Sequence, residues 1–190
     1  MSNTYFNRLK FVSINNRQNA KMLFSGFLFV AINVAATVAA AQTCVSYIPD
    51  ETPDSRYTID AGNGTVIDTQ TGLMWQRCSV GQTADASCSG TATRTNWQGA
   101  LQAAEQANID SLGGYTDWRL TNIKELSSLV SLQCVSPSIN SSVFPNTVSG
   151  GYWTSSPYAS TSGSAWFVHF GYGFAIDGSR DNGVQLRLVR

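Results

Sequence analysis

The sequence is poor in the residues on which most acid–base, metal and nucleotide chemistry depends. It contains one histidine, His169, and charged residues make up only 13% of the chain. It has no Cys-x-x-Cys pair, no Gly-x-Ser-x-Gly motif and no glycine loop of the kind that cradles phosphate. These absences argue against a zinc site, a serine-hydrolase site and a nucleotide site. Alternation along a strand places His169 opposite Trp166, Val168 and Phe170, which is typical of a half-exposed strand residue and predicts no catalytic role.

The first 41 residues contain no acidic side chain and have the pattern of a signal peptide. An apolar run over residues 22–38 leads into the small residues 39–41, and we expect cleavage after Ala41. The positive side chains before this run are Arg8, Lys10, Arg17 and Lys21. An uncleaved membrane anchor is the alternative, because about twenty largely apolar residues could span a bilayer. Either way the sequence predicts export, to the periplasm, the cell surface or the medium.

The part of the chain after residue 41 is acidic. It carries all twelve acidic residues of the sequence but only eight of the twelve basic ones. Negative charge is unfavourable for binding a phosphate backbone, so we do not expect a nucleic-acid partner. Arg180, Arg187 and Arg190 could form a basic patch near the C-terminus, but a scatter of solvated side chains is the expected arrangement.

All four cysteines lie in the exported part, and an even number in an exported chain predicts two disulfides. Cys78 and Cys88 flank a loop rich in serine, glycine and threonine, which favours a local pair. Cys44 and Cys134 would then form the second pair and tie the start of the exported chain to its middle. No cofactor is predicted, with calcium as the one alternative considered below.

The exported chain is long enough for one domain with a single core. Residues 42–59 are predicted to form an N-terminal arm, and residues 60–190 the folded domain. Two short strands, 57–60 and 65–68, surround a turn that contains Gly62-Asn63-Gly64. A core strand over 73–77 and a surface loop over 79–95 follow.

Two helices are predicted in the middle of the chain. Asn96 can cap the first, and Asn122, three residues before Glu125, can cap the second in a capping box. The apolar stripe of the first helix comprises Trp97, Ala100, Leu101, Ala104 and Ala107, and that of the second comprises Ile123, Leu126, Leu129 and Val130. Strand-like segments follow at 152–156, 165–170, 174–176 and 184–190. This order predicts an α+β fold, with two helices packed on a small, mainly antiparallel, twisted sheet with long loops.

The densest local pattern lies at residues 113–126. A glycine turn is followed by Trp118 between two opposite charges and then by the capped start of the second helix. We expect Asp117 and Arg119 to pair with each other or with a backbone amide, and so to organise the turn. A structural role is therefore predicted for both side chains.

Residues in the loops of the C-terminal third are the candidates for contact with a ligand. Tyr158 and Tyr172 are the aromatic candidates, because the five tryptophans are expected to anchor the core. The oxygen-bearing side chains of Asp177, Asp181 and Asn182 could hold calcium, although ordinary turn chemistry also explains them. Arg180, within the same stretch, is the remaining candidate.

Six blocks of sequence resemble, in order, one protein family. They are Thr-Gly-Leu-Met-Trp-Gln-Arg-Cys at 71–78, Gly-Tyr-Thr-Asp-Trp-Arg-Leu at 114–120, Lys-Glu-Leu at 124–126, Ile-Asn with Phe-Pro within 139–145, Tyr-Trp-Thr-Ser-Ser at 152–156 and Leu-Arg-Leu-Val-Arg at 186–190. Together they are similar to the Lcl C-terminal domain family, a bacterial domain named after the tail of a collagen-like adhesin. The family usually has proline where this chain has Thr121, and Asn122 can serve as the helix cap instead. The resemblance covers residues 60–190 and implies a C-type-lectin-like fold.

The resemblance does not name a ligand, because relatives of that fold bind sugars, proteins or ice and one branch makes formylglycine. This chain lacks the Glu-Pro-Asn, Gln-Pro-Asp and Trp-Asn-Asp triplets of calcium-dependent sugar binders. We predict an exported, non-catalytic binding or adhesion module that recognises a surface glycan or protein. An extracytoplasmic enzyme related to the formylglycine branch and a structural subunit of an envelope assembly are the alternatives. The oligomeric state stays open.

Overall fold

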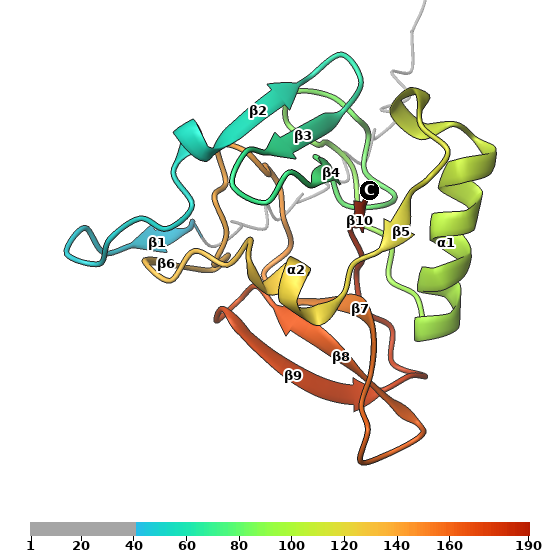
Figure 1. Ribbon diagram of the computed structural model, residues 1–190. Helices are drawn as coiled ribbons and strands as arrows, with labels where there is room; N and C mark the ends of the chain where they lie inside the picture. The colour runs from blue at the N-terminus through green and yellow to red at the C-terminus, as the bar shows by residue number, and fades with distance from the viewer. Residues whose placement is uncertain (1–40) are drawn as a thin grey trace, which may run out of the picture. The chain divides into compact units, whose positions relative to one another are not determined.

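The structure is a computed structural model that describes residues 41–190, which form an α+β domain (Figure 1). The signal peptide was predicted for residues 1–41, and residues 1–40 of it lie outside the described residues. The strands are β1 (Thr43–Cys44), β2 (Tyr57–Asp60), β3 (Thr65–Asp68), β4 (Met74–Gln76), β5 (Arg119–Leu120), β6 (Cys134–Val135), β7 (Gly151–Pro157), β8 (Ser164–His169), β9 (Phe174–Ser179) and β10 (Leu188–Val189). The helices are α1 (Trp97–Ile109) and α2 (Ile123–Ser127). The α+β prediction is confirmed, whereas the C-type-lectin-like relationship stays a prediction.

The larger sheet has five strands in the order β2-β3-β4-β10-β5, with antiparallel neighbours. The predicted hairpin supplies its first two strands, and Tyr57 pairs with Asp68. The last strand of the chain lies in the interior of the sheet, where Val189 pairs with Trp75. The end of the chain therefore completes a sheet that begins near residue 57.

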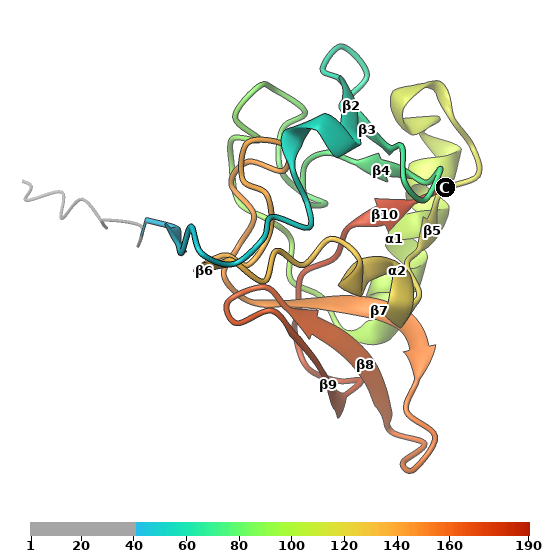
Figure 2. The ribbon, with the colours of Figure 1, turned by 60° about the vertical axis from the view of Figure 1, so that its left-hand side comes forward.

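A second sheet consists of β7, β8 and β9, again antiparallel (Figure 2). β8 is its central strand, and β9 is paired on one side only. Paired residues point to the same face, so Trp153, Phe167 and Ile176 share one face while Tyr152 and Val168 share the other. The second face is packed against the core, but the first face is covered only in part.

Both disulfides pair as predicted. Cys44 bonds to Cys134 with an S–S distance of 2.03 Å, and Cys78 bonds to Cys88 at 2.04 Å. The first bond links β1 to β6, so the start of the predicted arm is joined to the middle of the domain. Two disulfides indicate an oxidising environment outside the cytoplasm, consistent with export. Within residues 41–190 no helix is both long and apolar enough to cross a membrane.

Aromatic side chains anchor the core, as expected. Trp75, Trp118 and Trp153 are buried, whereas Trp97 and Trp166 are half-buried. Trp75 belongs to a cluster that also includes Leu126, Phe144 and Tyr152, and Trp118 and Trp153 belong to a second cluster under α1. The segment 184–189 is buried on both of its faces, so it passes through the interior between the two sheets.

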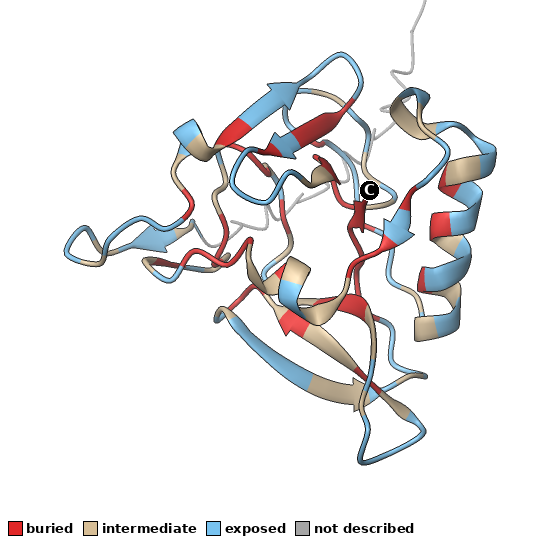
Figure 3. Cartoon of the chain, viewed as in Figure 1, coloured by how far each residue is buried: buried red, intermediate tan, exposed pale blue. Residues whose placement is uncertain are grey.

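The two helices begin where predicted. The Asn96 side chain accepts a hydrogen bond from the Gly99 amide at 2.8 Å and caps α1. The buried side of α1 consists of Ala100, Ala104 and Ala107, one narrow row along the helix (Figure 3). Placing Leu101 in this stripe was wrong, because it is 38% exposed. Three alanines spaced by about a turn bring the helix close to the sheet and leave a larger neighbour at the margin.

Candidate functional site

The six predicted contact residues do not form one site. Tyr172 lies in the turn between β8 and β9, next to the pair His169–Phe174. Tyr158, Arg180, Asp181 and Asn182 lie beyond the other end of these strands, near the pair Ser164–Ser179. Five residues of extended strand separate the two ends, about 17 Å. The sequence therefore grouped residues that the fold places at opposite ends of a hairpin.

Turn chemistry accounts for the residues proposed as calcium ligands. Asp177 lies within β9, where it pairs with Trp166, and only Asp181 and Asn182 lie in the following turn. The backbone amides of both turn residues donate to Ser179, to its hydroxyl and its carbonyl respectively. Residues 41–190 contain no group of three or more His, Cys, Asp or Glu side chains arranged to hold a metal ion.

Two further candidates serve the fold. The Arg180 guanidinium lies 4.2 Å from the ring centre of Trp97, and its Nε donates to the Ser164 carbonyl. The ring of Tyr158 packs edge-on against Trp166 with centres 5.2 Å apart. Both side chains therefore close the end of the hairpin against the rest of the domain.

The three C-terminal arginines do not form a basic patch, nor are they all solvated. Arg187 is fully buried, and its guanidinium donates to the carbonyls of Gln76 and Arg77 and to the Thr147 hydroxyl. Burial lowers the pKa of Arg187 to about 10. The expectation of a solvated side chain was wrong because this arginine satisfies backbone carbonyls from a distant strand.

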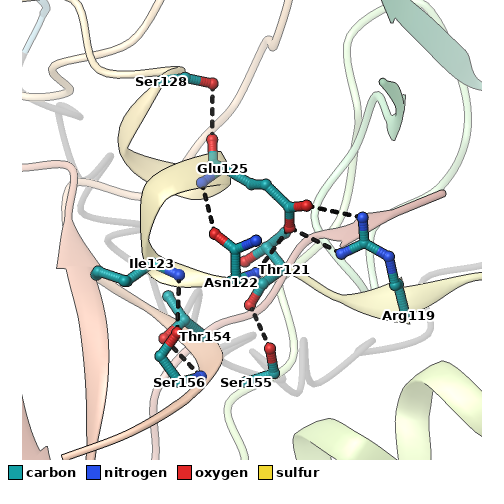
Figure 4. Close-up of polar contacts among 9 residues, drawn as sticks. All are labelled: Arg119, Thr121, Asn122, Ile123, Glu125, Ser128, Thr154, Ser155 and Ser156. Carbon is teal, nitrogen blue, oxygen red and sulfur yellow. Dashed lines mark hydrogen bonds and ion pairs between the residues drawn. The ribbon is translucent and has the colours of Figure 1, made fainter. Parts of the chain in front are cut away.

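The segment before α2 has the structural role expected of it, with different partners (Figure 4). Arg119 pairs with Glu125 at 2.8 Å, and Asp117 pairs with Arg190. The prediction that Asp117 and Arg119 pair with each other was therefore wrong. Asp117 lies just before β5 and Arg119 begins it, and each side chain pairs with a residue outside this segment, at the C-terminus and on α2 respectively.

The start of α2 is also bound to β7. Asn122 and Glu125 form the predicted capping box. The Ser156 hydroxyl accepts a hydrogen bond from the Ile123 amide, and the Ser155 hydroxyl donates to the Thr121 carbonyl (Figure 4). The polar end of the Tyr-Trp-Thr-Ser-Ser block thus holds the start of the helix in place.

A groove of about 450 Å³ lies over the partly covered face of the second sheet. Phe167 forms part of it, on the central strand. Ring carbons of Phe167 lie 2.8 Å from where a Cβ would stand on Gly151 and on Gly178, on the two neighbouring strands. The two glycines therefore let the ring lie low over the sheet, beside the edge of Trp153 at 5.8 Å. The result is an aromatic floor that a side chain at either glycine would displace.

Polar side chains line the rest of this groove. Arg94, His169, Asn182 and Gln185 are among the residues that line it. Arg94 donates through Nε and Nη2 to the Gly183 carbonyl, at 3.0 and 2.6 Å. His169 Nδ1 accepts a hydrogen bond from the Gly171 amide, so Nε2 carries the proton of the neutral ring.

Three nearly parallel rings stand next to the groove. His169, Tyr172 and Phe174 have centres 5.1 to 5.9 Å apart and ring planes within 22° of each other. Tyr172 is 70% exposed and Phe174 is 45% exposed. Ile176, 41% exposed, extends the apolar surface along β9. We call these four residues and Phe167 the open face of the second sheet.

Sequence reasoning identified only Tyr172 among the residues of the open face as a ligand contact. Phe174 and Ile176 were assigned to a strand, and of the groove residues only Asn182 was among the predicted contacts. A usable signal was present, because Tyr172, Phe174 and Ile176 alternate with small or polar residues in a hairpin that already has an apolar opposite face. When a hairpin at the edge of a fold has large apolar residues on both faces, one face packs on the core and the other is available to contact a partner.

Comparison with known proteins identifies the domain. The family model described as Lcl C-terminal domain matches residues 64–190. The chain belongs to this family. A comparison with curated protein sequences finds no match.

The Lcl C-terminal domain family match confirms the resemblance seen in the sequence. The blocks that carried the resemblance include Trp75, Trp118, Trp153 and Arg187, all of which are buried. By contrast, Arg94, Phe167, His169, Asn182 and Gln185 lie outside those blocks. The blocks therefore identify the fold of the domain, and the open face has to be interpreted from its own geometry.

Proposed function

We propose that this Lcl C-terminal domain is an exported, non-catalytic binding module that recognises a surface glycan or protein through its open face. The observation that carries the proposal is the set of parallel rings at His169, Tyr172 and Phe174, of which the last two are exposed, beside a polar groove. Exposed aromatic rings next to hydrogen-bonding groups are a common basis of recognition, because they offer contact area at a small entropic cost. The two disulfides support a role outside the cytoplasm, where such bonds persist.

The test is binding of the folded protein to a glycan array and to a panel of cells. The double variant Tyr172→Ser/Phe174→Ser is expected to lose the binding seen with the wild type, at unchanged stability. The matched control is Tyr47→Ser/Ile109→Ser, which removes two apolar side chains that are 85% and 70% exposed elsewhere. Equal binding by both double variants and the wild type would refute the proposed surface.

The alternative enzyme of the formylglycine branch would depend on reactive thiols. All four cysteines of the chain are in disulfides. Thiol titration of the folded protein is the direct measurement, and two or more reactive thiols would favour the enzyme over the binding module.

The open edge of β9 favours a second candidate function, a structural subunit of an envelope assembly. The Arg180 amide donates to the Gly163 carbonyl, and hydrogen-bonded pairs alternate along an antiparallel ladder. The backbone groups of Ala175 and Asp177 therefore point away from β8, where another strand could pair with them. Size-exclusion chromatography with light scattering tests this candidate, and a strict monomer would argue against it.

A further inference from the structure

A second cavity lies between α1 and the larger sheet, and its described lining shares no residue with the open face. Its volume is about 240 Å³, and five of its eight lining residues are apolar. These five are Val80, Ala103, Ala107, Leu112 and Leu188. The two alanines of α1 are too small to fill the space between the helix and the strands at this point. We call this cavity the α1 pocket.

One buried polar atom beside the α1 pocket has no partner. Val189 pairs with Trp75 across the larger sheet, so their neighbours Leu188 and Gln76 both point to the other face. Leu188 packs there in one cluster with the alanines of α1, so the side chain of Gln76, which also lines the pocket, lies on the α1 side. Its Oε1 is buried and has no hydrogen-bond partner within residues 41–190. A buried acceptor without a donor is unfavourable, and a ligand that supplies the donor would remove this penalty.

The rim of the α1 pocket is polar. Gln106 and Asp110 complete the lining, and Gln106 Nε2 donates to Asp110 Oδ1 at 2.9 Å. Both residues are exposed, so the pocket opens to solvent. Among the described residues that line it, none is basic. A ligand with a carboxylate or a phosphate would therefore lose its hydration without gaining a partner of opposite charge.

The size and the chemistry of the α1 pocket fit one aromatic side chain. Sites for drug-sized ligands measure about 300–1,000 Å³, and this pocket is smaller. Its apolar wall favours a hydrocarbon ring, and the single unpaired acceptor, Gln76 Oε1, favours a ring with one donor. Indole has this combination, because its N–H donates and it has no acceptor. Tryptophan is also enriched where proteins meet, as a side chain that fills a pocket of its partner.

We propose that the α1 pocket receives a tryptophan side chain of a partner protein, with its indole N–H donating to Gln76 Oε1. A rotation of the flexible Gln76 side chain presents this oxygen to the donor, while the ring packs against Leu112 and Leu188. The inference goes beyond the proposed function, because the open face takes no part in it. It gives the domain a second contact surface, directed at protein.

The experiment is a two-dimensional NMR titration of the intact exported domain with three probes. N-acetyltryptophanamide stands for tryptophan within a chain, indole is the free ring, and 1-methylindole is the same ring without the N–H donor. The first two probes are expected to shift the side-chain amide signals of Gln76 and the methyl signals of Val80, Leu112 and Leu188. The third is expected to bind about tenfold more weakly than indole, because it leaves the buried acceptor unpaired.

Two variants test the contacts separately. Gln76→Leu removes the acceptor, so it should abolish the preference for indole over 1-methylindole. Ala103→Leu places a larger side chain in the pocket and should abolish the binding of all three probes. The matched control Gln102→Leu adds a leucine at an exposed position of the same helix and should bind the probes as the wild type does.

The outcomes separate this pocket from the open face. Tyr172→Ser/Phe174→Ser should bind the three probes as the wild type does, whatever it does to the binding of glycans or cells. No shift at the pocket with indole or with N-acetyltryptophanamide would overturn the inference. Shifts with indole alone would also overturn it, because the pocket would then take a free small molecule and not a side chain. Equal affinity for indole and 1-methylindole in the wild type would contradict the role of Gln76.

Discussion

The two sheets of the domain differ in what their faces contact. In the larger sheet, Val66, Trp75 and Leu188 are all buried, and the family blocks supply much of the packing. In the second sheet, one face is packed around Val168 while the other leaves Tyr172, Phe174 and Ile176 exposed. Apolar side chains stabilise a fold when they are buried, whereas exposed apolar side chains that lie together can mark an interaction site.

The difference predicts two classes of substitution. Changes in the larger sheet or in the two disulfides should lower the free energy of unfolding and leave the specificity of binding at the open face alone. Changes on the open face should alter binding and leave stability alone. The predictions below test this separation from the largest expected effect to the smallest.

Removal of the long-range disulfide is expected to have the largest effect on stability. Cys44 and Cys134 are 90 residues apart, whereas Cys78 and Cys88 are 10 apart. In the chain-entropy model, Cys44→Ser/Cys134→Ser loses about 4–5 kcal/mol and Cys78→Ser/Cys88→Ser somewhat under about 3 kcal/mol. Urea unfolding of both double variants measures the two losses. A larger loss from the short loop would contradict the predicted order.

Arg187→Met is expected to cost about 3 kcal/mol, because it leaves buried carbonyl and hydroxyl groups without their donor. The matched control is Arg94→Met, which removes an exposed arginine beside the groove and should change stability by less than about 0.5 kcal/mol. Chemical denaturation of the two variants gives the comparison. Similar losses in both would show that the two regions do not differ as described.

A buried ion pair at the larger sheet should make the free energy of unfolding depend on pH. The Asp68 carboxylate is buried and pairs with Arg56. Burial pushes the pKa of Asp68 up, but hydrogen bonds from Arg56 and Thr71 outweigh it and hold the pKa below its ordinary value. Because the pKa of Asp68 is lower in the folded than in the unfolded protein, its ionisation stabilises the fold. This stabilisation is fully present above the pKa of an unfolded aspartate, about 3.9, and is lost as the pH falls through the folded-state pKa.

Asp68→Asn removes this contribution and should cost about 2 kcal/mol near neutral pH. The loss relative to the wild type should shrink as the pH falls below about 4. Thermal or urea unfolding across this range measures it. A loss that stays constant with pH would show that ionisation of Asp68 does not stabilise the fold.

The open face should contribute least to stability. Tyr172→Ser/Phe174→Ser is expected to change the free energy of unfolding by less than about 1 kcal/mol, because Tyr172 is 70% exposed and Phe174 is 45% exposed in the folded state. Differential scanning calorimetry alongside the binding assay checks both halves of the prediction. A large decrease in the free energy of unfolding would mean that the two rings are part of the core.

Much of the fold was predictable because its signals are local. The hairpin at 57–60 and 65–68, the caps at Asn96 and Asn122 and both disulfides depend on short stretches of sequence or on simple pairing. Leu101 was misassigned because a helical stripe does not reveal how closely a helix approaches its sheet.

The candidate site was less predictable, because distant residues build it. Gly151, Phe167 and Gln185 come from three separate segments that meet only in the folded chain. Likewise, Arg187 is buried because it reaches carbonyls 110 residues earlier in the chain. No local sequence pattern predicts a contact between residues that are so far apart in the chain.

The most direct test is hydrogen–deuterium exchange of the domain, free and bound to a cell surface that retains it. The account predicts that protection on binding concentrates in residues 148–151, 164–176 and 182–185, around the groove and the exposed rings. Protection confined to α1 or to β2, β3 and β4, with none in those segments, would contradict it.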